Sequence, residues 1–117
     1  MNKIFVLFLS LAFCGCYYDH ADELYGGTCE TTNVTYINGI SEMMNRYSCV
    51  SCHSGSVPSG NILLSTYADV KAVAASGRLW GAINHLSGFT PMPQGSNKMS
   101  QCDINKVKAW IDASTPQ

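Results

Sequence analysis

Apolar side chains recur along the chain at helical spacing and predict a series of short amphipathic helices. In the first of these, positions 37, 40, 43 or 44, and 47 are apolar, which is the three- and four-residue spacing of one helix face. Asn33 or Thr35 is the expected N-cap, because either side chain can accept a hydrogen bond from the first turn. The pattern therefore predicts a helix that ends near Tyr47.

Three further helical segments follow, so the predicted fold class is all-α. Apolar positions 67, 70, 73 and 74 predict a helix that begins at Ser65 or Thr66 and is closed by Gly77. A further helical turn is expected over 78–84. The last helix is expected to begin at Ser100, with Asp103 as its capping partner, and to pack against the first helix. Its apolar stripe consists of Ile104, Val107, Trp110 and Ile111.

Residues 1–15 are predicted to be a lipoprotein-type signal peptide. Lys3 supplies a positive charge, and residues 4–13 are nearly all apolar but too few to span a bilayer. The following Cys14-Gly15-Cys16 resembles the lipobox of bacterial lipoproteins, in which the signal is cut before a cysteine that becomes acylated. We expect lipidation at Cys16, because small Gly15 suits the cut site; lipidation at Cys14 and ordinary secretion are the alternatives. Residues 16–28 lack a clear period and are predicted to be a flexible tether.

Composition narrows the class of protein further. Charged residues make up 13% of the chain and the net charge is −1, where about a quarter of residues are charged in an average protein. Neither a nucleic-acid surface nor one for anionic membranes is therefore indicated. The remaining residues, 29–117, form one small domain of a size at which a hydrophobic core alone is only marginally stable.

The most specific chemical signal is the segment Cys49-Val50-Ser51-Cys52-His53. Two thiols and an imidazole at this spacing form the attachment pattern of a covalent c-type haem. Each thiol can add across a haem vinyl group, and His53 is then expected to be the proximal iron ligand. A thioredoxin-like pair would need a strand before the motif and a helix after it. A zinc site would need a second pair of ligands, so a small redox or metal module without haem is the weaker alternative.

Met92 is the candidate for the second iron ligand. It lies between Pro91 and Pro93, which limit the conformations of the loop that would aim its sulfur. His85, in the same segment, is the rival ligand, although the end of a helical turn also suits a structural histidine. His20 lies in the tether and is expected to be a solvent-exposed bystander.

Arg78 and Trp80 are candidate haem contacts, as a propionate partner and an aromatic wall. Plain surface charge and plain core packing are the alternatives for these two residues. The order of helix, haem motif, middle helices, Met92-Pro93 pair and terminal Trp110-Ile111 helix resembles a single-domain class I cytochrome c. The chain is especially similar to short lipoprotein monohaem cytochromes of Bacteroidetes-type bacteria, which share the Cys-Tyr-Tyr-Asp tether and a segment like residues 29–36.

The resemblance covers essentially the whole mature chain and implies three to five helices wrapped around one covalent haem c. It implies that Cys49 and Cys52 form the thioethers and that His53 and Met92 bind the iron. A disulfide is expected between Cys29 and Cys102, the cysteines left once the signal, the lipid and the haem have taken the others, in an oxidising compartment. In a cytochrome c fold the first and last helices cross, which would bring this pair together.

The expected function is that of an electron carrier, not an enzyme, tethered by lipid to a membrane of the bacterial envelope and facing the periplasm. Its partners would be redox proteins, with the carrier free or part of a larger electron-transfer complex. The alternative is a ligand-binding or peroxidatic haem protein with an open or bis-histidine distal site. Without haem, the domain is expected to be largely disordered, because its apolar residues would line an unfilled pocket.

Overall fold

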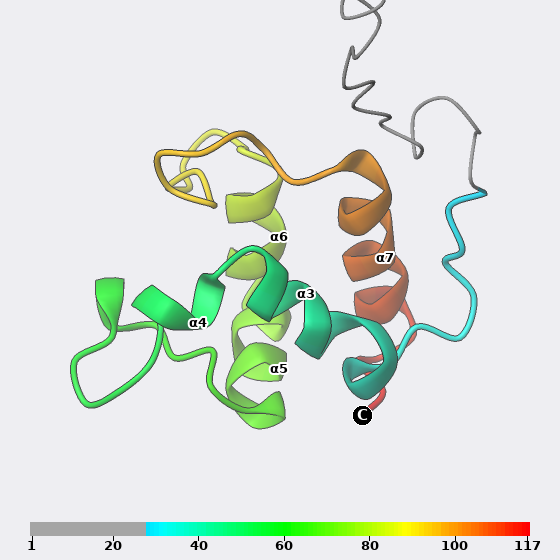
Figure 1. Ribbon diagram of the computed structural model, residues 1–117, viewed down its shortest axis with the longest axis horizontal. Helices are drawn as coiled ribbons and strands as arrows, with labels where there is room; N and C mark the ends of the chain where they lie inside the picture. Colours follow the sequence, from blue (N-terminus) through cyan, green and yellow to red (C-terminus); the bar gives the residue numbers. More distant parts are fainter. Residues whose placement is uncertain (1–27) are drawn as a thin grey trace, which may run out of the picture.

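The computed structural model describes residues 28–117, and in this part of the chain the regular elements are helices, with no strand (Figure 1). The all-α class predicted from the sequence is therefore confirmed for these residues. The elements in chain order are the π-helical turn η2 (Tyr36–Ile40), α3 (Ser41–Arg46), α4 (Cys49–Cys52), the 3₁₀ turn η3 (Ser59–Asn61), α5 (Tyr67–Ala75), α6 (Arg78–Ile83) and α7 (Gln101–Asp112).

The predicted signal peptide and nearly all of the predicted tether lie outside the described residues, and so do Cys14, Cys16 and His20. Export and lipidation stay predictions. Within residues 28–117, no helix combines the length and the apolar character needed to cross a bilayer.

Local hydrogen bonds fix where α5 and α7 begin. The Thr66 hydroxyl accepts the N–H of Asp69 at 3.3 Å, and the Asp69 carboxylate accepts the N–H of Thr66 at 2.9 Å, which is a reciprocal capping box. The Ser100 hydroxyl accepts the N–H of Asp103 at 3.1 Å. Gly77, with φ 75°, separates α5 from α6, as a left-handed residue after a helix commonly does. These predicted boundaries are confirmed.

The first helix differs from its prediction in the opening turn. Thr35 is the N-cap, but the chain then makes a π turn in which the Ile40 N–H bonds to the Thr35 carbonyl at 3.3 Å. A π turn closes over one residue more than an α turn, so Tyr36 instead of Ile37 lies on the core side. Ile37 is 72% exposed, whereas the Tyr36 ring lies 6.4 Å from that of Trp110. The prediction that position 37 belongs to the buried face is wrong.

The core extends from η2 and α3 across α7 to α5 and α6. The predicted apolar stripe of α7 contributes Ile104, Val107 and Trp110, which are completely buried, and Ile111 is partly buried against the core. Contacts between α7 and η2 confirm that the last helix packs against the first. The buried apolar residues are Ile40, Met43, Met44, Leu64, Val70, Ala74, Leu79, Ile83, Met99, Ile104, Val107 and Trp110.

A buried carboxylate ties the end of α3 to the start of α7. Asp103 is 5% exposed and accepts hydrogen bonds from the Tyr47 hydroxyl at 2.7 Å and the Ser100 hydroxyl at 2.9 Å. Arg46 lies 3.2 Å from the same oxygen. Because a buried carboxylate needs such partners, these contacts fix the two helices relative to each other.

A disulfide and the C-terminal segment reinforce the same region. Cys102 is bonded to Cys29, the partner expected from the sequence, with their Cα atoms 5.5 Å apart. The Pro116 carbonyl accepts hydrogen bonds from the Trp110 indole at 2.7 Å and from the Tyr36 N–H at 2.9 Å. The chain that precedes η2 and the chain that follows α7 are therefore both fastened to this part of the core.

Candidate haem-attachment site

The helix α4 is a single turn that carries both cysteines of the motif. It follows Ser48, whose φ of 54° is left-handed and separates α4 from α3. Cys49 is half-buried and Cys52 exposed, and both are free thiols. The N–H of His53 bonds to the carbonyl of Cys49 at 3.0 Å, so the helical turn that carries the two cysteines ends directly at His53.

His53 is buried, at 7% exposure, and its ring is fixed by the loop that follows. Its Nδ1 lies 3.1 Å from the carbonyl oxygen of Ile62, which can only accept a hydrogen bond. Nδ1 must therefore carry a proton, and in the neutral imidazole Nε2 is then the nitrogen with the lone pair. A histidine that ligates a metal commonly has this arrangement, with one nitrogen held by a carbonyl and the other left for the ion.

The surroundings of Cys49 favour a neutral thiol. Burial raises the pKa of the Cys49 thiol above its ordinary value, against a lowering hydrogen bond from its own backbone, and nearby Cys52 raises it further. A neutral thiol is a poor nucleophile for disulfide exchange. The motif is also preceded by α3 and followed by an irregular loop, which is not the strand-before, helix-after order of a thioredoxin-like pair.

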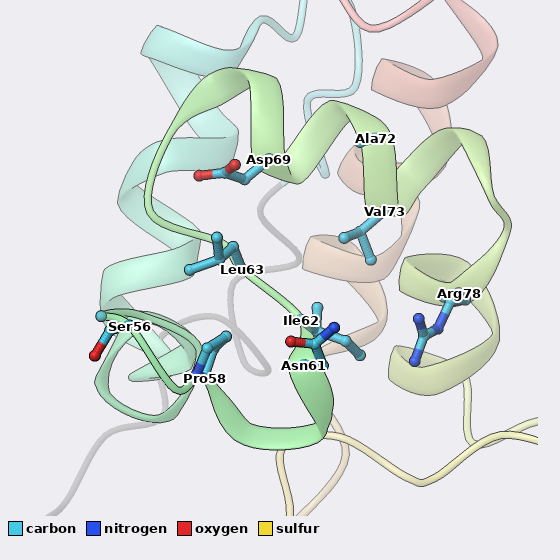
Figure 2. A pocket seen from close by; sticks show the side chains of 10 residues that line it. Ser56, Pro58, Asn61, Ile62, Leu63, Asp69, Ala72, Val73 and Arg78 are labelled. Atoms are coloured by element: carbon cyan, nitrogen blue, oxygen red, sulfur yellow. The ribbon is translucent and has the colours of Figure 1, made fainter.

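A cavity of about 440 Å³ opens beside the motif, between the loop 55–63 and the helices α5 and α6. Figure 2 shows the side chains of Ile62, Leu63 and Val73 gathered between Asp69 and Arg78. The cysteines and His53 of the motif are not part of its lining. Ile62 connects the motif to the cavity, because its carbonyl is bonded to the ring of His53 and its side chain lines the cavity.

The two charged side chains that line this cavity, Asp69 and Arg78, differ in whether they already have a bonding partner. The carboxylate of Asp69 is used by the Thr66 cap. Arg78 is exposed, and within residues 28–117 it has no carboxylate at ion-pair distance. The cavity therefore combines an apolar wall with a cation that can receive a carboxylate.

Met92 lies half-buried in the long loop between α6 and α7. Its N–H bonds to the Ala82 carbonyl at 3.0 Å, and its carbonyl lies 3.0 Å from Nε2 of the exposed His85. In Figure 1 this loop, yellow to orange, first bends out to the side of the α5–α6 column on which α4 lies and then crosses over to α7. The distal candidates are thus joined to each other through the backbone of Met92.

Trp80 lies elsewhere. It is half-buried on α6, where Nζ of Lys108 from α7 lies 5.9 Å from its ring centroid, and it does not line the cavity. Of the two candidate haem contacts on α6, Arg78 therefore lines the cavity and Trp80 does not.

Several contacts of the site have no recognisable signal in the sequence. The roles of Ile62 and Ala82 depend on backbone carbonyls, which no residue type marks. The sequence suggests His85 only as a rival iron ligand, because its contact with the Met92 carbonyl has no local signature. Within residues 28–117, no three histidine, cysteine, aspartate or glutamate side chains converge where they could hold a metal ion by themselves.

Comparison of the chain with protein-family models, curated proteins and solved structures finds no match. The resemblance to class I cytochromes c is therefore still a prediction.

Proposed function

We propose that this protein is an electron carrier with one c-type haem, attached through Cys49 and Cys52. The observation that carries the proposal is the state of His53, which directly follows two free thiols. Its ring is buried and held through Nδ1 by the Ile62 carbonyl, so the lone pair of Nε2 is available to iron. When bound, haem iron supplies a one-electron change between its ferric and ferrous states.

The residues beside the motif suit a planar, largely apolar group that carries carboxylates. Ile62, Leu63 and Val73 offer apolar contacts, and Arg78 offers a guanidinium with no carboxylate partner in the described part of the chain. Arginine is well matched to a carboxylate, because its planar fork can donate two parallel hydrogen bonds. This supports the assignment of Arg78 as a propionate partner, and it gives no support to Trp80 as a haem wall.

The proposal assigns Met92 as the residue that would hold the iron together with His53. A thioether is a soft ligand that favours ferrous iron and raises the reduction potential. Both the amide and the carbonyl of Met92 are hydrogen-bonded, which restricts the loop before any ligand is present. If His53 and Met92 both held the iron, it would exchange electrons without binding a substrate, and for this reason we propose a carrier and not an enzyme.

The proposal includes export and a lipid anchor at Cys16, with redox proteins as partners at an uncharged rim. The intact mass of the mature protein tests the anchor. We expect cleavage before Cys16 and the added mass of acyl chains on that residue. An unmodified N-terminus, or a chain that begins at Cys14, would correct this part of the proposal and leave the haem assignment standing.

Absorption spectra of the holoprotein, produced together with haem-attachment machinery, test the haem and its ligands. We expect a ferric sulfur-to-iron charge-transfer band in the red and a ferrous form that does not bind carbon monoxide. Met92→Ala should lose the band and bind carbon monoxide. Met99→Leu is the matched control, because it removes the thioether of a core methionine and should leave the band in place.

The contact between His85 and Met92 is the observation behind a second candidate function, that of a ligand-binding or peroxidatic haem protein. His85 places an imidazole in the same loop as Met92, so a bis-histidine or open distal site is the natural rival. If Met92 binds the iron, His85→Ala should keep the red band. A wild-type protein that lacks the band and binds carbon monoxide readily would favour the rival, and a protein purified without covalent haem would favour a redox or metal module.

A further inference from the structure

We propose that His85 is a positioning residue, which holds Met92 toward the iron by bonding to the Met92 backbone carbonyl. The inference rests on the function proposed above. Nε2 of His85 lies 3.0 Å from the Met92 carbonyl oxygen. That oxygen can only accept, so Nε2 carries the proton and donates it.

The loop that carries Met92 is fastened back onto α6 by main-chain hydrogen bonds. The N–H of Leu86 bonds to the Gly81 carbonyl at 3.0 Å, and the N–H of Met92 bonds to the Ala82 carbonyl at 3.0 Å. The hydrogen bond from the His85 side chain restrains the carbonyl group of Met92 as well. The main chain of Met92 is thus restrained at both its amide and its carbonyl.

An aromatic contact also packs this loop against α6. A Cβ added at Gly81 would come within 2.5 Å of ring atoms of Phe89, so the ring lies directly over the glycine backbone and no larger residue fits there.

Among the hydrogen bonds described for Met92, the one from His85 alone involves a side chain. It is therefore the one that a substitution can remove while the main-chain bonds stay.

A bond of this kind affects how easily Met92 leaves the iron. An added ligand such as imidazole can bind only when the thioether is displaced, and displacement is easier when the loop is free to move. The His85 bond lowers the population of the displaced state and so weakens the apparent affinity of a competing ligand. The loss of one neutral hydrogen bond should raise that affinity about three- to tenfold.

The experiment is a titration of the ferric holoprotein with imidazole, followed by the red charge-transfer band. We expect His85→Ala to keep the band without imidazole and to bind imidazole about three- to tenfold more tightly than wild type. His85→Gln should restore the wild-type affinity, because its amide N–H can donate to the same carbonyl. Ser87→Ala is the control, since Ser87 is exposed in the same loop and should titrate as wild type.

The outcomes separate this inference from the proposed function. Equal imidazole affinity in His85→Ala and wild type, with the band present in both, overturns the positioning role and leaves the electron carrier intact. A tighter affinity that glutamine does not reduce overturns it as well. A wild-type protein without the band contradicts the proposed function itself, and the inference fails with it.

Discussion

The two sides of this molecule are built differently. The helix crossing, which consists of η2, α3 and α7, buries Ile40, Ile104 and Trp110 completely and satisfies its carboxylate, Asp103, with several donors. The motif side consists of α4 and the loops 54–64 and 84–98. It leaves four large apolar side chains at the surface, namely Val57 at 90%, Leu63 at 40%, Leu86 at 45% and Phe89 at 39% exposure, whereas the helix crossing leaves one, Ile37 at 72%.

The contrast shows where each side obtains its stability. The helix crossing is held by contacts of the chain with itself, including the bond between Cys29 and Cys102. On the motif side the only α-helix, α4, is a single turn, and among the residues of the two loops only Leu64 belongs to the buried core. Little burial therefore offsets the ordering of these loops. Under the proposed function, haem contacts supply the missing burial. Substitutions on the two sides should therefore have different consequences.

The largest effect should follow the loss of covalent haem in Cys49→Ala/Cys52→Ala. A small domain has a total stability of about 5–10 kcal/mol, and removal of the haem contacts should consume most of it. We expect a largely disordered chain without a cooperative melt in far-ultraviolet circular dichroism. Ser51→Ala, in the same helical turn, should melt cooperatively like wild type. A haem-free variant with native-like helicity would mean that the motif side supports itself as the helix crossing does.

The next effect in size concerns the disulfide of the helix crossing. Cys29 and Cys102 are 73 positions apart, and a bond that closes a loop of this length stabilises the fold by roughly 4 kcal/mol through the entropy of the unfolded chain. Cys29→Ser/Cys102→Ser should lower the free energy of unfolding by about that amount in urea titrations and leave the haem spectrum unchanged. A thiol reductant should reproduce the effect in wild type, because thioethers are not reduced. Unchanged stability would contradict the prediction.

A smaller loss should follow Asp103→Asn, at the buried carboxylate of the same crossing. The amide cannot accept from Tyr47, Ser100 and Arg46 together, so a buried donor is left without a partner. We expect a loss of about 2–3 kcal/mol in the free energy of unfolding, measured in urea. Asp112→Asn is the matched control, because its pair with Lys108 is exposed and should contribute less than about 0.5 kcal/mol. Equal losses in the two variants would contradict the role of Asp103.

Much of the helix crossing was predictable because its signals are local. The Ser100 cap of α7 is visible as a hydroxyl residue three positions before an aspartate, as is the Thr66 cap of α5 outside the crossing, and the α7 stripe follows from its spacing. The π turn was not predictable, since Ile37 and Tyr36 are both apolar and the spacing cannot choose between them. The bonds of Tyr47 to Asp103 were not predictable either, because residues far apart in sequence meet only in the folded chain.

On the motif side, the residue types were predictable and their arrangement was not. The spacing of Cys49, Cys52 and His53 by itself indicates haem chemistry. The carbonyl of Ile62 that fixes the His53 ring, and the imidazole of His85 that meets the Met92 carbonyl, depend on how irregular loops fold. Loops carry few periodic signals, so their contacts are visible only in the folded chain.

The smallest effect should come from Arg78, at the edge of the cavity on the motif side. If its guanidinium lies beside a haem carboxylate, its positive charge disfavours ferric iron, and Arg78→Ala should lower the reduction potential by about 20–40 mV, as expected for one partly exposed charge. Arg78→Lys should keep most of the potential, because the charge stays. Lys71→Ala is the matched control, since Lys71 carries the same charge on α5 but contacts Tyr67 and does not line the cavity. A spectroelectrochemical titration measures all three variants. Equal shifts in Arg78→Ala and Lys71→Ala would reduce Arg78 to an ordinary surface charge and separate the cavity from the haem site.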